Sequence, residues 1–409
     1  IIFYLGKILF DRKIGLIAAI LYAVSFEQSQ FAIYIGNPTL GSLSVPLMYL
    51  GLVLVIFAKK AWGLPLAFLG LGFSIQFQFA LFYLIVPFIL ILFLFKKYFF
   101  NLSLKIWGVS VLTLVFSLSS FILAEFKFQF IATNALIHMV TQVNDKNLIN
   151  IFSTYFFEIM QIVKYNILGN LKIDFFVNFA LVISFIFFIR KKEVKEQLTF
   201  LCIWFFSLFL IFYMGGGVQE PWRNMPLYYP NVGVSVALLL FVAFLLNKFK
   251  FKIIIILLII LVNAQLIKDL NPKGSMAEID VQQGMLLSDE KKVLDYMYQE
   301  SKGEPFAVKA VTMPFDINTT WSYLFEYYGN KNYGYLPLWN GKTALGYPGN
   351  LKVQEAQEGL PNKRYVIIEP LRGVPNHLVN DFMKIENYFT NITDEKKIGD
   401  FVIQKRKKY

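Results

Sequence analysis

The sequence predicts an α-helical polytopic membrane bundle followed by a C-terminal extracytoplasmic α/β domain, and three observations support this prediction. The 409 residues are 56% hydrophobic and only 16% charged, whereas soluble domains carry about 25% charged residues. Residues 61–95, 106–124 and 198–219 contain no charged residue, and each stretch could cross a hydrocarbon core of about 30 Å as a helix. The composition then becomes ordinary, so we expect a transmembrane domain at 1–268 and a second domain at 269–409.

Basic residues separate the apolar runs into two alternating sets of connections. The first set holds fourteen Lys or Arg residues: Arg12, Lys13, Lys59, Lys60, Lys96, Lys97, Lys105, Arg190, Lys191, Lys192, Lys195, Lys248, Lys250 and Lys252. The second set holds five: Lys127, Lys146, Lys164, Lys172 and Arg223. Because cytoplasmic loops are enriched in Lys and Arg, the first set is predicted to be cytoplasmic. The second set and the C-terminal domain are then predicted to lie on the outer face.

The same alternation sets the number of spans. Lys60 and Lys96 should lie on one side, and the 35 residues between them would form a helix of about 52 Å, so two short spans with a turn near Gln76–Gln78 are expected. About ten spans follow, at 1–10, 14–30, 40–58, 61–76, 78–95, 105–124, 175–190, 198–214, 230–247 and 252–268. The chain begins with Ile inside an apolar run, so we expect it to lack its true N-terminus and part of the first span.

Several function classes find no support in the sequence. The net charge of +12 follows the topology pattern and gives no reason to expect nucleic-acid binding. The phosphate-binding loop G-x-x-x-x-G-K-[ST] and the hydrolase motifs G-x-S-x-G and H-E-x-x-H are missing. His138 and His377 are far apart and Cys202 is the single cysteine, so neither a metal nor a cofactor is expected, and Cys202 is interpreted as a buried structural thiol.

Polar residues gather instead at the predicted outer ends of the spans, where together they suggest an outward-facing polar cleft. Glu27, Gln28 and Gln30 end the second span, although we do not assign them to the substrate site. The predicted substrate-binding residues are Asn37, Gln78, Glu125, Lys127, Arg223, Tyr228 and Tyr229. Amide, acidic and aromatic side chains suit a sugar, and the cations suit a phosphate. We rank Arg223 above Lys127 for the phosphate, because a guanidinium can bind two of its oxygens.

The outer segments carry their own secondary-structure signals. Residues 147–168 mix apolar and polar positions at helical spacing, which fits either an interfacial helix or a helix that caps the bundle in solvent. In the C-terminal domain we expect a helix at 288–301 with Ser288 as N-cap, and a long loop at 330–363. The other predicted elements are strands at 305–312, 364–369 and 398–405 and helices at 319–328 and after Pro375. We expect this domain to pack over the outer ends of the spans.

Four segments resemble a known family of membrane enzymes. YLGKILFDRKIGLIAAILYAVS at 4–25 resembles an early span of prokaryotic GT-C glycosyltransferases, of the dolichyl-phosphate-mannose protein mannosyltransferase type (family 39). IGNPTLGSL at 35–43 is similar to the start of their next span. GLGFSIQFQFAL at 70–81 resembles a turn that carries His where this chain has Gln78. In SFILAEFKFQFIATNAL at 120–136, Glu125 matches the family pattern, while Lys and Phe replace its Arg and His.

The resemblance covers most of residues 1–250 and implies a specific activity. GT-C enzymes transfer a sugar from a polyprenyl-phosphate carrier to a lipid, glycan or protein acceptor on the outer face. Their general base is an Asp, or an Asp-Glu pair, in the first outer loop, which would precede Ile1, so we promote neither Glu27 nor Glu125 to that role. The resemblance therefore predicts a GT-C-like glycosyltransferase whose catalytic carboxylate lies before this chain.

Two other functions stay open at this point. The alternative is a secondary transporter or lipid flippase, although no repeat relates 1–124 to 175–268 and charges inside the spans are scarce. A membrane-anchored binding protein, in which the outer domain carries the function, ranks last because it would not need so many spans.

Overall fold

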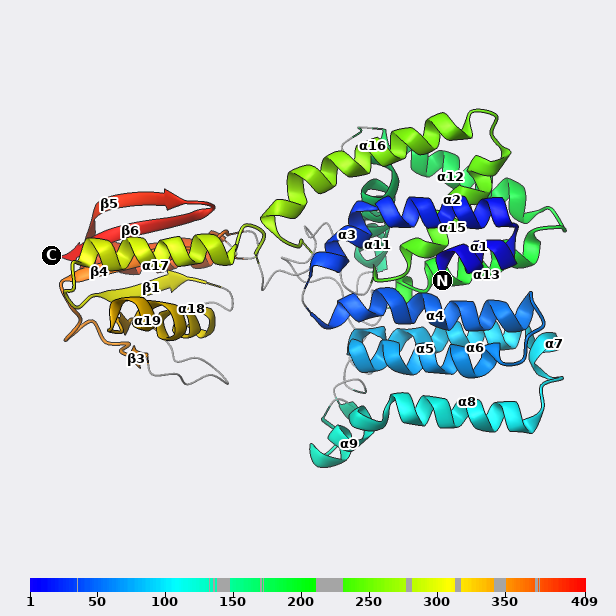
Figure 1. The fold of residues 1–409 in the computed structure, drawn as a ribbon, viewed down its shortest axis with the longest axis horizontal. Coiled ribbons are helices and arrows are strands. Elements are labelled where there is room, and N and C mark those ends of the chain that lie inside the picture. Colours follow the sequence, from blue (N-terminus) through cyan, green and yellow to red (C-terminus); the bar gives the residue numbers. More distant parts are fainter. Residues whose placement is uncertain are drawn as a thin grey trace. The chain divides into compact units, whose positions relative to one another are not determined.

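The computed structural model describes residues 1–409, apart from 35, 132, 135–136, 138–147, 170, 172, 211–230, 277–281, 313–317, 342–350, 372–373 and 375. The chain divides into two compact units, Ile1–Pro272 and Lys273–Tyr409. The first, which we call the helical unit, is built from helices, and the second, the sheet unit, contains the β-sheet (Figure 1). The predicted domain boundary at 268/269 lies four residues before the division between the units.

The helical unit contains a helix or a helix pair at each of the ten predicted apolar runs. Its first half contains α1 (Ile2–Leu9), α2 (Arg12–Val24), α3 (Phe26–Ile33), α4 (Asn37–Ile56), α5 (Gly63–Phe77), η1 (Phe79–Leu84), α6 (Ile85–Leu94), α7 (Lys96–Phe99), α8 (Leu104–Ser117) and α9 (Ser119–Lys127). Its second half contains α11 (Leu148–Val163), the π-helical turn η3 (Lys164–Leu168), α12 (Asp174–Ile189), α13 (Lys195–Phe206), α15 (Ser235–Lys248), α16 (Lys252–Leu270) and the short η6 (Asn271–Lys273), which ends in the sheet unit. The predicted turn near Gln76–Gln78 is confirmed by the end of α5.

Among the described residues, two helical segments are long and apolar enough to cross a membrane, Thr39–Ile56 within α4 and Lys252–Lys273. The number rises to four if each bent pair forms one span, α2 with α3 and α8 with α9. The ten-span bundle therefore remains a prediction. The helix pairs at the predicted spans 14–30 and 105–124 are bent by 54° and 55°.

The first of these bends has a clear local cause. Ser25 adopts an extended backbone, with φ −62° and ψ 128°, and its Oγ accepts a hydrogen bond from the backbone N–H of Gln28. Ser25 thereby ends α2 and caps α3, as hydroxyl side chains commonly do at a helix N-terminus.

Helices α4 and α5 approach each other closely because glycines line their contact. A Cβ atom on Gly51 would lie 2.3 Å from the backbone nitrogen of Ala67, and one on Gly70 would lie 2.4 Å from the nitrogen of Met48. Only a residue without a side chain fits at these two positions. Small residues at helix contacts allow this kind of backbone packing in membrane proteins.

The sheet unit is a three-layer α/β fold. Its strands are β1 (Ala307–Val311), β2 (Leu338–Trp339), β3 (Lys352–Val353), β4 (Lys363–Ile368), β5 (Thr390–Ile398) and β6 (Phe401–Lys408), in the order β3-β2-β1-β4-β6-β5. The first four strands in this order run parallel, and β6 is antiparallel to β4 and β5. The helices are α17 (Leu287–Ser301), α18 (Thr319–Leu324), the π-helical turn η7 (Phe325–Gly329), α19 (Asn330–Tyr333) and α20 (Asn376–Phe389).

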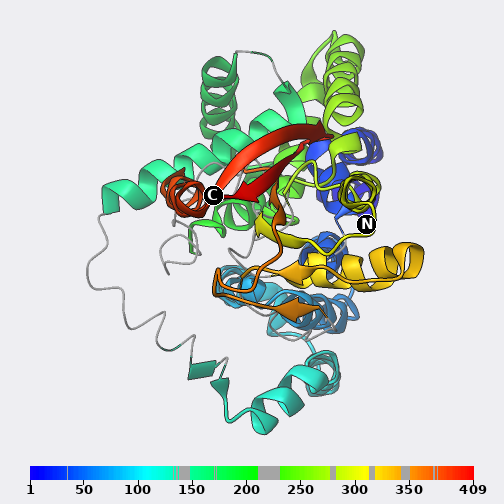
Figure 2. The ribbon, with the colours of Figure 1, turned by 90° about the vertical axis from the view of Figure 1, so that its left-hand side faces the viewer.

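Each face of the sheet has its own apolar core. Residues of α17 and α18 pack with one face around Trp321, Trp339 and Tyr365. On the other face, Phe382 of α20 packs against Val311 and Val366. The view along the strands in Figure 2 shows the strands with α20 on one side.

Three predictions for this unit need correction. Helix α17 begins at Leu287 with Leu286 as its N-cap, so Ser288 lies inside the helix. The predicted loop at 330–363 contains α19 and the two short strands β2 and β3. Strand β5 was not predicted, because its TNITDEKKI sequence is charged and almost wholly exposed, without the alternation that marks a half-buried strand. Such charges are common on edge strands, where they discourage pairing with other chains.

Candidate functional site

A group of buried polar side chains joins five segments of the helical unit, and we call it the buried polar cluster. Its members are Ser25, Glu27, Gln28, Glu158, Asn166, Asn231, Ser235 and Asn263. They come from the α2–α3 bend, α11, η3, the start of α15 and α16. Burying a polar group costs free energy unless the group forms hydrogen bonds.

Asn166 and Asn263 hold the bend between α2 and α3 in place. Asn166 donates through Nδ2 to Glu27 Oε2, and its Oδ1 accepts from Ser25 Oγ at 2.6 Å. Asn263 accepts from the backbone N–H of Phe26 at 2.8 Å and donates to the backbone oxygen of Asn166 at 3.2 Å. Two amides from α16 and η3 therefore satisfy the backbone and side chains that the bend exposes.

The remaining members extend the cluster toward α15 and α11. Gln28 Nε2 donates to Ser235 Oγ at 3.0 Å, and Asn231 Nδ2 donates to Glu158 Oε2 at 3.1 Å. Glu158 is also an electrostatic neighbour of Glu27, and the Ser235 hydroxyl interacts with the Glu27 carboxylate as a hydrogen-bond partner. The Glu27 side chain is 1% exposed. The cluster thus contains two carboxylates, and no salt bridge among the described residues involves either of them.

Several oxygen atoms of the cluster have no hydrogen-bond donor within the described part of the chain. They are Glu27 Oε1, Gln28 Oε1 and Asn231 Oδ1. Gln161 Oε1, on the turn of α11 that follows Glu158, also has no donor among the described residues. An unpaired buried acceptor costs roughly 1–3 kcal/mol. The cluster is therefore rich in acceptors and could bind a ligand that supplies donors.

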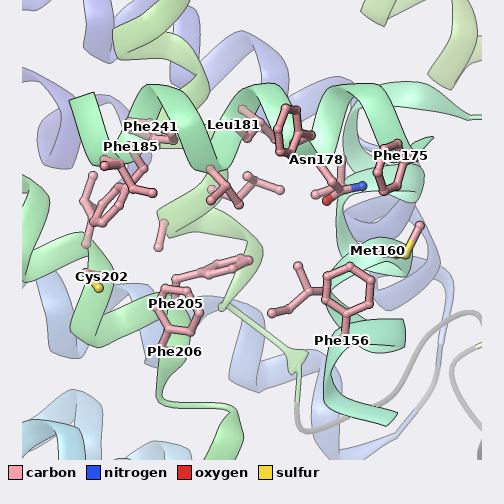
Figure 3. Close-up of a pocket in the computed structure, with 18 residues that line it drawn as sticks. Phe156, Met160, Phe175, Asn178, Leu181, Phe185, Cys202, Phe205, Phe206 and Phe241 are labelled. Atoms are coloured by element: carbon pink, nitrogen blue, oxygen red, sulfur yellow. The ribbon is translucent and has the colours of Figure 1, made fainter. Parts of the chain in front are cut away.

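An apolar pocket of about 500 Å³ lies between α11, α12, α13 and α15 (Figure 3). Two of its helices also carry cluster residues: Phe156 and Ile159 of α11 flank Glu158, and Ala237 of α15 lies two residues after Ser235. Eighteen side chains of the described residues line the pocket, and among them Asn178 is the single amide and Cys202 the single thiol. A volume of this size is typical of small-molecule sites in proteins.

The residues predicted as substrate ligands lie in different places. Asn37 begins α4, and Gln78 follows α5 and is half-buried. Glu125 is buried on α9 and accepts hydrogen bonds from the backbone and hydroxyl of Thr133, at 2.9 and 2.6 Å. Lys127 ends α9, exposed, with Nζ 5.3 Å from the ring centroid of Phe128.

Figures 1 and 2 both place α9 on the opposite side of the helical unit from α16, which carries Asn263. Arg223, Tyr228 and Tyr229 lie outside the described residues. The predicted convergence of all seven substrate residues in one cleft therefore remains a prediction.

Sequence reasoning noted Glu27 and Gln28 but missed their partners. Asn166 lies in the loop interpreted as interfacial, and Asn263 lies in the last apolar run. An amide inside an otherwise apolar run is the signal that could have found Asn263, because polar residues are costly in a membrane and usually face a partner. Comparison with known proteins finds no matching family model, curated protein or solved structure.

Proposed function

We propose that the protein is a multi-pass membrane glycosyltransferase with a GT-C-like helical bundle. It would move a sugar from a polyprenyl-phosphate donor to an acceptor on the extracytoplasmic face. The observation that carries the proposal is the group of buried oxygens of Glu27, Gln28 and Asn231 that have no donor within the described residues. Sugar hydroxyls are donors, and a carboxylate that accepts from a hydroxyl forms one of the stronger hydrogen bonds in proteins.

The cluster can position a sugar without serving as the general base. Glu27 keeps one oxygen bound to Asn166, while the other has no partner in the described part of the chain, so its carboxylate has a fixed orientation and one site for a hydroxyl. Gln28 is held in the same way by Ser235. Preorganised acceptors of this kind lower the entropy cost of orienting a substrate.

The apolar pocket supports a lipid-linked donor over a free nucleotide sugar. Its lining is almost entirely aliphatic and aromatic, which suits a hydrocarbon chain. A nucleotide would need polar partners for its base, its ribose and two phosphates, and the described lining of this pocket offers one amide, Asn178.

A transfer assay with two matched variants tests the proposal. Radiolabelled sugar transfer from a polyprenyl-phosphate sugar is measured in proteoliposomes that contain the protein. We expect transfer by the unaltered protein. Glu27→Gln should lower transfer roughly ten- to hundred-fold, the value of a charged hydrogen bond.

The matched variant is Glu125→Gln, which alters a buried glutamate that already has partners in Thr133. A loss confined to Glu125→Gln would move the site to α9. If the protein transfers sugar from no polyprenyl-phosphate donor, the proposed function is wrong.

A secondary transporter or lipid flippase is the second candidate, and the pair Glu27 and Glu158 favours it. Two neighbouring buried carboxylates without a basic partner are common in proton-coupled carriers. Substrate-dependent proton uptake by proteoliposomes, lost in Glu27→Gln and in Glu158→Gln, would support transport, whereas the glycosyltransferase should move no protons across the bilayer.

A further inference from the structure

The apolar pocket has one end that differs chemically from the rest. Phe156, Met160, Phe175 and Asn178 are close together at this end, while Cys202 and Phe241 lie toward the other (Figure 3). Asn178 donates to the backbone oxygen of Asp174 at 2.8 Å, at the start of α12. The pocket thus has an apolar body and one end near the first turn of α12.

Lys164 follows the pocket-lining part of α11 in the sequence. Phe156, Met160 and Lys164 are spaced by four residues, so they follow one face of the continuous helix formed by α11 and η3, and the first two line the pocket. Val163, the neighbour of Lys164, lines it as well. Lys164 is half-buried, with Nζ 5.4 Å from the ring centroid of Tyr165, and it has no salt bridge among the described residues.

Two buried acceptor oxygens belong to residues that are next in sequence to pocket-lining residues. Asp174 Oδ1, adjacent to Phe175, and Gln161 Oε1, adjacent to Met160, are buried and have no donor within the described ranges. A cation beside unpaired acceptors complements a headgroup that combines an anion with hydroxyl groups, because the anion binds the amine and the hydroxyls donate to the oxygens. A simple alkyl chain would leave all three groups without partners.

We propose that this pocket holds the first isoprene units of the polyprenyl-phosphate donor, and that Lys164 binds its phosphate. The inference rests on the proposed function for the identity of the lipid. A polyprenyl phosphate brings one hydrocarbon chain to a pocket of about 500 Å³, whereas a phospholipid brings two. This assignment moves the phosphate away from Arg223 and Lys127, the residues that sequence reasoning favoured.

Cys202 provides a reporter of pocket occupancy, because it lines the pocket and is the single cysteine of the chain. The protein in detergent is treated with an uncharged thiol-reactive probe, with and without a short-chain polyprenyl phosphate. We expect the lipid to slow labelling of Cys202. Lys164→Gln should raise the concentration needed for half-maximal protection roughly ten- to hundred-fold, and Lys164→Arg should restore protection.

The control variant is Lys268→Gln, which removes an exposed lysine in the last turn of α16 and should leave protection unchanged. Equal protection by polyprenol without phosphate, or by phosphatidylglycerol, would show a pocket that accepts any hydrocarbon chain and would overturn the inference. Unchanged protection in Lys164→Gln would overturn the role of the lysine. Protection of Cys202 without any sugar transfer would support the lipid site and contradict the proposed function. Sugar transfer without protection would support the proposed function and contradict the lipid site.

Discussion

The buried polar side chains of the sheet unit and of the helical unit differ in their hydrogen-bond partners. In the sheet unit, Arg406 is 1% exposed and donates to Thr390, Gln404 and Asn387, while Lys309 pairs with the buried Glu386 at 2.8 Å. In the helical unit, five buried carboxylate or amide oxygens have no donor within the described residues. In the sheet unit, the described buried atoms without a partner are Asn318 Oδ1 and the hydroxyl or N–H groups of Ser322, Tyr335, Trp339 and Arg364. The unpaired atoms are therefore mainly acceptors in the helical unit and mainly hydroxyl or N–H groups in the sheet unit.

The largest expected effect concerns the side of the membrane on which each connection or domain lies. In a Cys202→Ser background, a membrane-impermeant maleimide applied to intact cells should label Glu300→Cys in the sheet unit and leave Lys192→Cys unlabelled. The reason is the unequal distribution of basic residues between alternate connections. The same reasoning places Arg12, Lys60, Lys97 and Lys250 inside the cell, and labelling at position 192 together with silence at 300 would invert the topology.

The next largest effect is on the stability of the sheet unit. Residues 273–409 expressed alone should be soluble and unfold cooperatively in urea. Arg406→Met should lower the free energy of unfolding by about 3 kcal/mol or more, because it leaves the acceptors of Thr390, Gln404 and Asn387 unpaired inside the fold. A loss below about 1 kcal/mol would mean that these bonds are not essential to the fold.

The corresponding change in the helical unit should have a smaller effect on stability. Glu27→Gln keeps the shape of the side chain and an oxygen that can accept from Asn166, while it removes a buried charge. We expect the melting temperature in detergent to stay the same or rise, with a change in free energy of about 1 kcal/mol or less. Strong destabilisation would show that the carboxylate is structural, and the contrast between the units would disappear.

The smallest effect tests the pH dependence of the sheet unit. Burial raises the pKa of Glu290, in the first turn of α17. The folded state therefore holds its proton at a pH where the unfolded state has lost it, so stability falls as pH rises from the unfolded pKa through the folded one. Glu290→Gln should flatten that slope and stabilise the unit near neutral pH by at most about 1 kcal/mol, which urea unfolding at pH 4 and pH 7 can measure.

The sequence was informative about elements and less so about contacts. Apolar runs and turn residues predicted the positions of the helices, because a run such as 252–268 is mainly apolar along its whole length. The bend at Ser25 was missed because a serine in an apolar run is compatible with a straight helix, and only its contacts with Gln28 and Asn166 show the break. The buried polar cluster depends on partners separated by up to 237 residues, and no local pattern encodes such pairings.

The hydrogen bond from Phe26 to Asn263 also has a consequence for the order of events during synthesis. In a bilayer, a freed backbone N–H costs several kcal/mol until it finds a partner, and here the partner is added 237 residues later. At typical elongation rates that interval is on the order of 10–50 s. For a chain that crosses the membrane as proposed, the backbone N–H at the bend between α2 and α3 therefore lacks this partner until α16 has been synthesised.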